Sequence, residues 1–168
     1  MAKRVLHLVR HGQYNLKLRE QGELTGRGRE QAHRAAAVLA QTPLDRMVYS
    51  PVPRAVQTAQ LIGTGLNGVP MQQDDILREC LPPMTPRVME VLALGHMASS
   101  PQEMARCAER LDDVFQRYVV APNGEDQADL LVCHGNVIRY LVARALDIDL
   151  ATWTRLLIHN CSITRLVI

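Results

Sequence analysis

Short apolar runs alternate with amphipathic stretches along this chain, and the alternation predicts strands followed by helices. Three runs are typical of buried strands, at Val5–Val9, Met47–Tyr49 and Leu130–Cys133. They are apolar at nearly every position, as parallel strands are when both faces of their sheet are covered. Two further strands are predicted near the C-terminus, at Arg155–Ile158 and Ile163–Ile168, around the turn-like Asn160-Cys161-Ser162.

Helical patterns lie between these runs. The chain is Ala-rich from Thr25 to Gln41, and Thr25 is suited to cap a helix there. Ser50-Pro51 predicts the start of a second helix, because serine can cap and proline fits the first helical position. Ser100-Pro101-Gln102-Glu103 is a capping-box sequence, followed by apolar residues at helical spacing. A fourth helix is predicted directly after Cys133.

Strands that alternate with helices indicate a mostly parallel sheet, joined by crossovers of the usual right hand. The sequence therefore predicts an α/β fold, a three-layer sandwich with a mostly parallel central sheet and helices on both faces. We expect a single domain over residues 1–168, because the chain shows no repeat, no low-complexity tract and no linker. Its proline cluster at Leu81–Pro86 is interpreted as a loop within that domain.

Basic side chains follow three of the predicted strands, where ligands bind in open sheets of this kind. The first strand is followed by Arg10 and His11, the third by His134. The second is followed by Ser50 and, one helical turn later, by Arg54. Guanidinium forks match phosphate oxygens, and a neutral imidazole can attack phosphorus to give a phosphohistidine. Their convergence at one sheet edge predicts a site for a phosphoryl group.

Each of these residues has a structural alternative when it is taken singly. A histidine at a strand end is more often structural, and Arg54 alone could be a solvated helix residue. His7 and His11 lie four apart on one strand and could suggest a metal pair, but a strand lacks the helical geometry that makes such pairs useful. The chain also has no obvious metal-binding carboxylate cluster, so no metal and no cofactor are expected.

Composition narrows the classes of partner. Hydrophobic residues make up 47% of the 168 positions, which is enough for a full core. Aromatic residues make up only 4%, so few rings could stack on bases, and no nucleic acid is expected. The basic cluster of Lys17, Arg19, Arg27, Arg29 and Arg34 is interpreted as a face that steers substrate. No apolar run approaches the roughly 18 residues of a membrane span, so no membrane is expected either.

The cysteines and the N-terminus bear on the compartment. Cys80, Cys107, Cys133 and Cys161 lie far apart in the sequence and form no C-x-x-C pair. That spacing favours buried free thiols in a reducing compartment over a disulfide framework. The first predicted strand begins close to Met1, which leaves no room for a signal or transit peptide. We therefore expect the protein to be cytoplasmic.

Three sequence blocks together resemble the motifs of a known family, the histidine phosphatase superfamily of phosphoglycerate-mutase-like proteins. The blocks are Val9-Arg10-His11-Gly12, Ser50-Pro51-x-x-Arg54-Ala55-x-Gln57-Thr58-Ala59 and Cys133-His134-Gly135-Asn136. With Leu24-Thr25-x-x-Gly28-Arg29-Glu30-Gln31-Ala32 they cover essentially the whole chain. Gln13-Tyr14 and Asn136-Val137-Ile138-Arg139-Tyr140 look most like the serine/threonine protein phosphatase branch, which has a mitochondrial animal member.

The resemblance implies a phosphoglycerate-mutase-like fold and a role for each matching residue. His11 would be the nucleophile, and Arg10, Arg54 and His134 would complete the phosphate pocket. Glu79 would protonate the departing oxygen and then deprotonate the attacking water.

Some of these assignments leave alternatives open. A surface carboxylate paired with Arg78 or Arg87 is the alternative reading of Glu79. Asn136 and Gln13 are further candidates for substrate binding, although mutases of the family usually carry glutamate where this chain has Gln13. Candidates for the pocket rim are Gln13, Tyr14, Lys17, Arg78 and Met84.

The function expected from these residues is hydrolysis of phosphomonoesters without a metal, through a phosphohistidine on His11. A mutase must cover its pocket with a lid, and the connecting segments of this chain look too short to form one. Phosphoserine and phosphothreonine in proteins are the expected substrates through the family branch. The alternatives are a small-molecule or phosphohistidine phosphatase and, outside enzymes, a phosphopeptide-binding module. Relatives carry a membrane-anchoring and assembly segment that is not expected here, and a homodimer is left open.

Overall fold

The computed structural model describes residues 2–81 and 100–168, and within them five strands form one sheet. The strands are β1 (Arg4–Arg10), β2 (Arg46–Tyr49), β3 (Met71–Gln73), β4 (Gln127–Cys133) and β5 (Ile163–Val167). They lie in the order β3-β2-β4-β1-β5. The pairs β3·β2, β2·β4 and β4·β1 are parallel, and β5 runs antiparallel to β1 at the edge. The mostly parallel central sheet is therefore confirmed.

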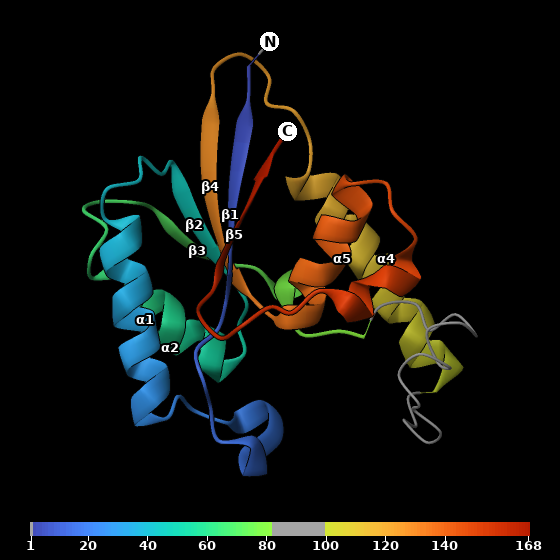
Figure 1. Ribbon diagram of the computed structural model, residues 1–168, viewed down its shortest axis with the longest axis horizontal. Coiled ribbons are helices and arrows are strands. Elements are labelled where there is room, and N and C mark those ends of the chain that lie inside the picture. The colour runs from blue at the N-terminus through green and yellow to red at the C-terminus, as the bar shows by residue number, and fades with distance from the viewer. Residues whose placement is uncertain (1, 82–99) are drawn as a thin grey trace.

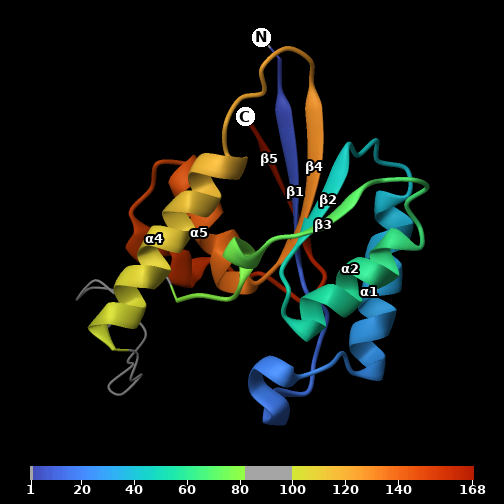
Figure 2. The same ribbon diagram turned by 180° about the vertical axis from the view of Figure 1, so that it is seen from behind.

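Helices cover both faces of this sheet (Figures 1 and 2). The α-helices are α1 (Gly26–Leu39), α2 (Pro53–Gly63), α4 (Pro101–Tyr118) and α5 (Gly135–Ala145). Helices α1 and α2 lie on one face, and α4 and α5 on the other. Short 3-10 helices are found at η1 (Leu16–Gln21), η2 (Asp75–Leu77) and η3 (Leu150–Arg155). The predicted three-layer α/β architecture is confirmed by this arrangement.

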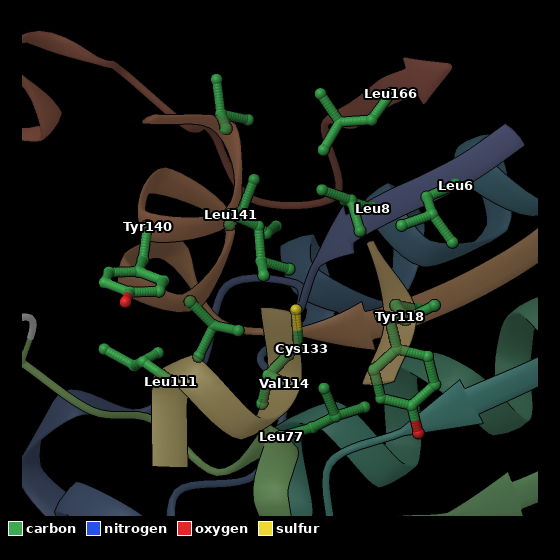
Figure 3. Packing of buried hydrophobic residues seen from close by; sticks show 14 of the residues in the cluster. Leu6, Leu8, Leu77, Leu111, Val114, Tyr118, Cys133, Tyr140, Leu141 and Leu166 are labelled. Atoms are coloured by element: carbon green, nitrogen blue, oxygen red, sulfur yellow. The ribbon is translucent and has the colours of Figure 1, made fainter. Parts of the chain in front are cut away.

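The alternation of side chains along the central strands gives each face its own core. On β4, Leu131 and Cys133 pack with α4 and α5, whereas Leu130 and Val132 pack with α1 and α2. All four side chains are fully buried. Figure 3 shows the first of these cores, where Leu111 and other apolar residues of the helices meet the sheet. Successive strand residues point to opposite faces, so a strand that is apolar throughout fits a sheet covered on both sides.

Two strand predictions differ from the structure. Strand β3 was missed because its three residues, Met71–Gln73, are all exposed and carry no apolar pattern. The strand predicted at Arg155–Ile158 is wrong. Helix η3 includes Arg155, and the three residues after it have no regular structure. The carbonyl groups of this segment accept hydrogen bonds from arginine side chains instead of a strand, Leu156 from Arg139 and Ile158 from Arg10.

The predicted helix starts hold at two places and shift at one. Thr25 caps α1 by accepting a hydrogen bond from the Gly28 N–H, and the capping box at Ser100 is present. Helix α2, however, has Val52 at its N-cap and Pro53 in its first turn, instead of Ser50 and Pro51. The Ser50 hydroxyl group instead contacts His134, the residue that follows β4. Of the proline cluster predicted as a loop, all but Leu81 lies outside the described residues.

The expectation of free thiols is wrong for one pair of cysteines. Cys80 and Cys107 form a disulfide, with their Cα atoms 5.7 Å apart, while Cys133 and Cys161 are free. Positions 27 apart in the sequence meet because α4 packs beside η2, which Cys80 follows closely in the chain. Sequence spacing could not show that contact. The cytoplasmic location stays a prediction, and it can no longer be supported by free thiols at Cys80 and Cys107. Among residues 2–81 and 100–168, none of the helices combines the length and the hydropathy of a membrane-spanning segment.

Candidate active site

Three neighbouring strand ends bring the predicted phosphate-site residues together. Strands β1 and β4 are in register, with Arg10 opposite Cys133, so the residues that follow them emerge side by side. The ring centres of His11 and His134 lie 5.1 Å apart. Arg54, in the first turn of α2 after β2, reaches both rings. All three of these side chains are buried, with exposed fractions of 4% or less.

The hydrogen bonds of His11 define which nitrogen is available. Its Nδ1 lies 2.8 Å from the carbonyl oxygen of Gly12, which can only accept, so Nδ1 carries the proton. Its Nε2 therefore has the lone pair, and it accepts a hydrogen bond from Arg54 Nε at 3.1 Å. Burial lowers the pKa of His11 to about 3, helped by the charges of Arg54 and Arg10 and opposed by the Gly12 contact. The imidazole is consequently neutral at pH 7.

His134 is also neutral, with the opposite tautomer. Its Nδ1 lies 3.4 Å from an N–H group of Arg54, so this nitrogen accepts. Its Nε2 then carries the proton and donates to Ser50 Oγ at 2.8 Å. Burial lowers the pKa of His134 well below its ordinary value, with further lowering from the nearby charges. Both ring orientations are thus fixed before any ligand binds.

Guanidinium N–H groups remain without a partner beside these rings. Arg54 Nη1 and Arg10 Nε are buried and make no hydrogen bond within the described residues. The Arg54 guanidinium also stacks over the Tyr14 ring, 4.4 Å from its centre, and Arg10 Nη1 donates to the Ile158 carbonyl at 2.6 Å. A buried cation with unused donors carries a desolvation cost that an anion would offset. The site is therefore suited to an oxyanion.

Glu79 lies just after η2, in the wall of a cavity of about 630 Å³ that Arg54 and Tyr14 also line. Its Oε1 accepts a hydrogen bond from the Cys80 N–H at 3.1 Å. Burial raises the pKa of Glu79, while the Cys80 N–H and then the charges of Arg54 and Arg10 act to lower it. The net rise favours a carboxyl group that can donate a proton.

The alternative reading of Glu79 as a surface carboxylate paired with arginine fits poorly. Arg78 points to Asp75 instead, with 3.0 Å between Arg78 Nε and Asp75 Oδ1. Arg87, the other arginine considered, lies outside the described residues. Glu79 instead lines the cavity whose wall includes Arg54, the side chain that contacts both histidines.

The remaining predicted residues occupy different positions around the site. Asn136, in the first turn of α5, lines the same cavity, and its Oδ1 accepts from Arg139. Gln13 faces α1, where its Oε1 accepts a hydrogen bond from Thr25 Oγ1 at 2.9 Å. Of the rim candidates, Tyr14 and Arg78 line the cavity, and Lys17 is exposed on η1. Met84 lies outside the described residues.

Some residues that hold the site escaped the sequence reasoning. Asn160 Nδ2 donates to the carbonyl oxygen of His11 at 2.9 Å, and the Cys161 N–H donates to that of Arg10 at 2.8 Å. Thr58 Oγ1 accepts from the Gly12 N–H at 3.0 Å. The turn at Asn160 was visible in the sequence, but no local pattern indicates that it lies against the first strand. Thr58 stands in a quoted motif block, which was the one available signal.

A close contact between backbones explains a glycine in the signature. A Cβ atom on Gly12 would overlap the carbonyl of Gly28, and one on Gly28 would overlap the carbonyl of Gln13. The first turn of α1 therefore lies directly against the residues that follow His11. Within the described ranges, no three His, Cys, Asp or Glu side chains gather closely enough to hold a metal ion.

Sequence comparisons agree with this geometry. Serine/threonine-protein phosphatase PGAM5, mitochondrial, from Rattus norvegicus is 36% identical over 176 residues, covering 99% of this chain and 59% of that protein. The Pgam5 protein of Caenorhabditis briggsae is 38% identical over 175 residues, with the same two shares. The chain thus spans less than two thirds of the length of these curated relatives.

Structural comparisons confirm the phosphoglycerate-mutase-like fold. A phosphoglycerate mutase from Plasmodium falciparum superimposes with a TM-score of 0.68 at 27% identity, covering 99% of this chain and 84% of that one. A mycobacterial glucosyl-3-phosphoglycerate phosphatase in complex with VO3 gives 0.71 at 29% identity, covering 96% and 92%. A model of one protein family, the histidine phosphatase superfamily (branch 1), matches residues 6–168. On the match of that model and of relatives above 30% identity, the chain belongs to the histidine phosphatase superfamily.

Proposed function

We propose that this chain hydrolyses phosphomonoesters without a metal ion, through a phosphohistidine formed on His11 Nε2. The observation that carries the proposal is the pairing of a neutral His11, whose Nε2 lone pair faces Arg54, with unused N–H groups on Arg54 and Arg10. A nucleophile beside a preformed oxyanion site is the arrangement that phosphoryl transfer needs.

In the first step the phosphoryl oxygens accept hydrogen bonds from Arg54 and Arg10. Arg54 Nε then no longer donates to His11 Nε2, so the lone pair of that nitrogen becomes available. Nε2 of His11 then forms a bond to phosphorus as the ester P–O bond breaks. Glu79 gives its proton to the leaving oxygen, so the alcohol departs neutral. The two arginines hold the charge on the equatorial oxygens, and His134 holds Arg54 in place by accepting a hydrogen bond from it.

The second step returns the enzyme to its starting state. The ionised Glu79 accepts a proton from a water molecule as that water attacks the phosphorus. The P–N bond to His11 breaks, inorganic phosphate leaves, and both Glu79 and the neutral imidazole are restored. All protons and electron pairs balance over the cycle without a metal.

Phosphoserine and phosphothreonine in proteins are the substrates that we propose. The support is the name of the curated relatives, which are serine/threonine-protein phosphatases, together with an open cavity beside the phosphate site. A small phosphoester is the second candidate, because a structural relative of 29% identity is a glucosyl-3-phosphoglycerate phosphatase. Steady-state turnover of a phosphoserine peptide, glucosyl-3-phosphoglycerate and 4-nitrophenyl phosphate by the wild-type chain ranks these candidates.

The role of Glu79 is tested with leaving groups of different basicity. Glu79→Gln should lower kcat/KM for a phosphoserine peptide by about 10²-fold or more, because a serine alkoxide needs a proton as it leaves. The kcat/KM for 4-nitrophenyl phosphate should fall much less, since a nitrophenolate leaves without a proton and the later hydrolysis of the phosphohistidine does not enter kcat/KM. Equal losses of kcat/KM on both substrates would exclude Glu79 as the acid. Binding of the peptide without turnover of any ester by the wild type would favour the phosphopeptide-binding module.

A further inference from the structure

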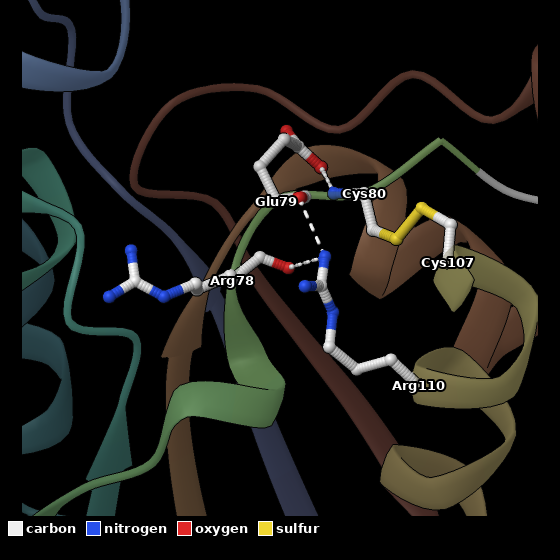
Figure 4. The surroundings of a disulfide bond; sticks show 5 residues. All are labelled: Arg78, Glu79, Cys80, Cys107 and Arg110. Carbon is white, nitrogen blue, oxygen red and sulfur yellow. Dashed lines mark hydrogen bonds between the residues drawn. A yellow bond between two sulfur atoms is a disulfide. The ribbon is translucent and has the colours of Figure 1, made fainter. Parts of the chain in front are cut away.

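Helix α4 contacts the Glu79 segment through two side chains that lie on one of its faces (Figure 4). Arg110 Nη2 donates to the carbonyl oxygen of Glu79 at 3.0 Å and to that of Arg78 at 3.5 Å. Cys107, three residues earlier on the helix, is bonded to Cys80. Residues three apart on a helix are neighbours, so both contacts come from the same turn of α4.

The disulfide is also coupled to the carboxylate itself. Cys80 anchors the chain covalently through its sulfur, and its backbone N–H donates to Glu79 Oε1 at 3.1 Å. One residue therefore both orients the Glu79 carboxylate and is fixed to α4. Arg110 fixes the other side of the same residue by holding the Glu79 carbonyl. Figure 4 shows Glu79 held between these two contacts.

All of these groups lie at the cavity beside the phosphate site. Glu79, Cys80, Cys107 and Arg110 line the same volume of about 630 Å³ as Arg54. A disulfide that serves stability alone can lie anywhere in a fold. This one joins the segment that carries Glu79 to a separate helix, in the wall of the cavity that Arg54 also lines.

We propose that Arg110 and the Cys80–Cys107 disulfide position the Glu79 carboxyl for protonation of the leaving group, and that reduction of the disulfide weakens this step. The inference rests on the proposed role of Glu79 as the acid. Reduction by a dithiol breaks the S–S bond with two electrons and two protons and leaves two thiols, while the dithiol becomes a disulfide. The segment then keeps Arg110 as its contact with α4 and loses the covalent one.

The first test replaces Arg110. Arg110→Gln should lower kcat/KM for a phosphoserine peptide by about tenfold or more, because a displacement of about 1 Å can cost about 10²-fold. The kcat/KM for 4-nitrophenyl phosphate, whose leaving group needs no proton, should change by less than about threefold, and the peptide and aryl rates below are these kcat/KM values. Arg110→Lys, which keeps a donor and the charge, should restore part of the peptide rate. Peptide and aryl rates that fall by the same factor would overturn the positioning role.

A matched control separates positioning from charge. Arg106→Gln removes the same charge from the same helix and the same cavity wall. If charge alone matters, Arg106→Gln and Arg110→Gln should change the ratio of peptide to aryl rates equally, which would contradict the proposal. Positioning requires that only Arg110→Gln lowers that ratio. Thermal melting of each variant confirms that the chain is folded under the assay conditions.

The second test uses the wild-type chain in two redox states. Treatment with dithiothreitol, followed by its removal without air, should lower kcat/KM for the peptide by about threefold to tenfold and leave kcat/KM for the aryl ester nearly unchanged. Reoxidation should restore the peptide rate. Cys80→Ser/Cys107→Ser should match the reduced wild type and show no response to dithiothreitol. A peptide rate that is the same in both redox states would overturn the role of the disulfide.

These outcomes differ from a failure of the proposed function. If the wild type has no turnover, or if Glu79→Gln affects both ester classes equally, the assignment of Glu79 as the acid has failed and the positioning role falls with it. If Glu79→Gln selectively slows the peptide while neither Arg110→Gln nor reduction does, only the positioning role is overturned.

Discussion

At the scale of the residue, Arg54 is the side chain on which both histidines depend. Its Nε donates to His11 and one terminal nitrogen donates to His134, while the other makes no hydrogen bond within the described residues. The planar fork can therefore hold both rings in place and still offer a donor to the substrate. A lysine could supply the charge but only a single nitrogen.

We accordingly expect Arg54→Lys to lower kcat on 4-nitrophenyl phosphate by about 10²–10³-fold, the cost typical of removing a preorganised donor from a charged transition state. Steady-state kinetics, with circular dichroism to confirm the fold, measure this loss. Arg144→Lys is the control, because Arg144 pairs with Asp112 on the outside of α5. Comparable activity of the Arg54→Lys and Arg144→Lys variants would show that a positive charge at position 54 is sufficient for catalysis without the planar guanidinium.

The buried imidazoles also make stability depend on pH. The unfolded chain takes up a proton on His11 near pH 6.5, whereas the folded chain does so only near pH 3, because burial lowers the pKa. The unfolded state thus binds more protons between these values. The contribution of His11 to the free energy of unfolding is complete above about pH 6.5 and is lost progressively as the pH falls towards 3. His134 acts in the same direction.

Urea unfolding at pH 7.5, 6.5 and 5.5 measures this dependence, in a window above most carboxyl titrations. The free energy of unfolding should fall from pH 7.5 to 5.5 in the wild type. It should fall less in His11→Gln/His134→Gln, which has neither proton acceptor. An identical pH dependence in the two proteins would mean that these histidines do not resist protonation in the folded state.

At the scale of the element, the start of α1 fixes the residues that follow the nucleophile. Thr25 at the N-cap of α1 holds Gln13 through both its backbone N–H and its hydroxyl group. Gly28 in the first turn approaches so closely that a side chain there would overlap the Gln13 carbonyl. Helix α1 therefore acts as a rigid support on which the turn after His11 rests.

A pair of substitutions in the first turn of α1 tests this support. Gly28→Ala should destabilise the chain by about 1–3 kcal/mol through overpacking, although alanine is the better helix former. Gly26→Ala in the same turn meets nothing within 4 Å and should be neutral or slightly stabilising. The free energy of unfolding from urea titration separates the two variants. Equal effects of both substitutions would mean that the close contact carries no energetic weight.

At the scale of the whole molecule, the sequence predicted the sheet and the strand ends better than it predicted what surrounds them. Arg10, His11 and His134 were placed at one edge because buried parallel strands are apolar throughout and deliver their next residues to the same side. The exposed edge strand Met71–Gln73 has no such pattern. Its pairing with β2 depends on tertiary contact instead of composition.

The contacts between distant segments could not be predicted either, because they also depend on tertiary contact and leave no pattern in the local sequence. Asn160 reaches the carbonyl of His11 from 149 residues away, and the Cys80–Cys107 disulfide joins two elements whose packing no periodicity encodes. Glu79 was found through the resemblance to the family, since nothing in its local sequence distinguishes it from a surface carboxylate. The residues that carry the chemistry could be predicted from strand ends and motifs. The residues that hold them in place could be found only from the fold.

The central claim is that His11 carries the phosphoryl group during turnover. The most direct test is mass spectrometry after rapid quenching without acid, with 4-nitrophenyl phosphate as substrate, in the wild type and in His11→Ala. We expect an acid-labile phosphoryl adduct on His11 in the wild type, and neither adduct nor turnover in the variant. Turnover that persists in His11→Ala would exclude His11 as the nucleophile.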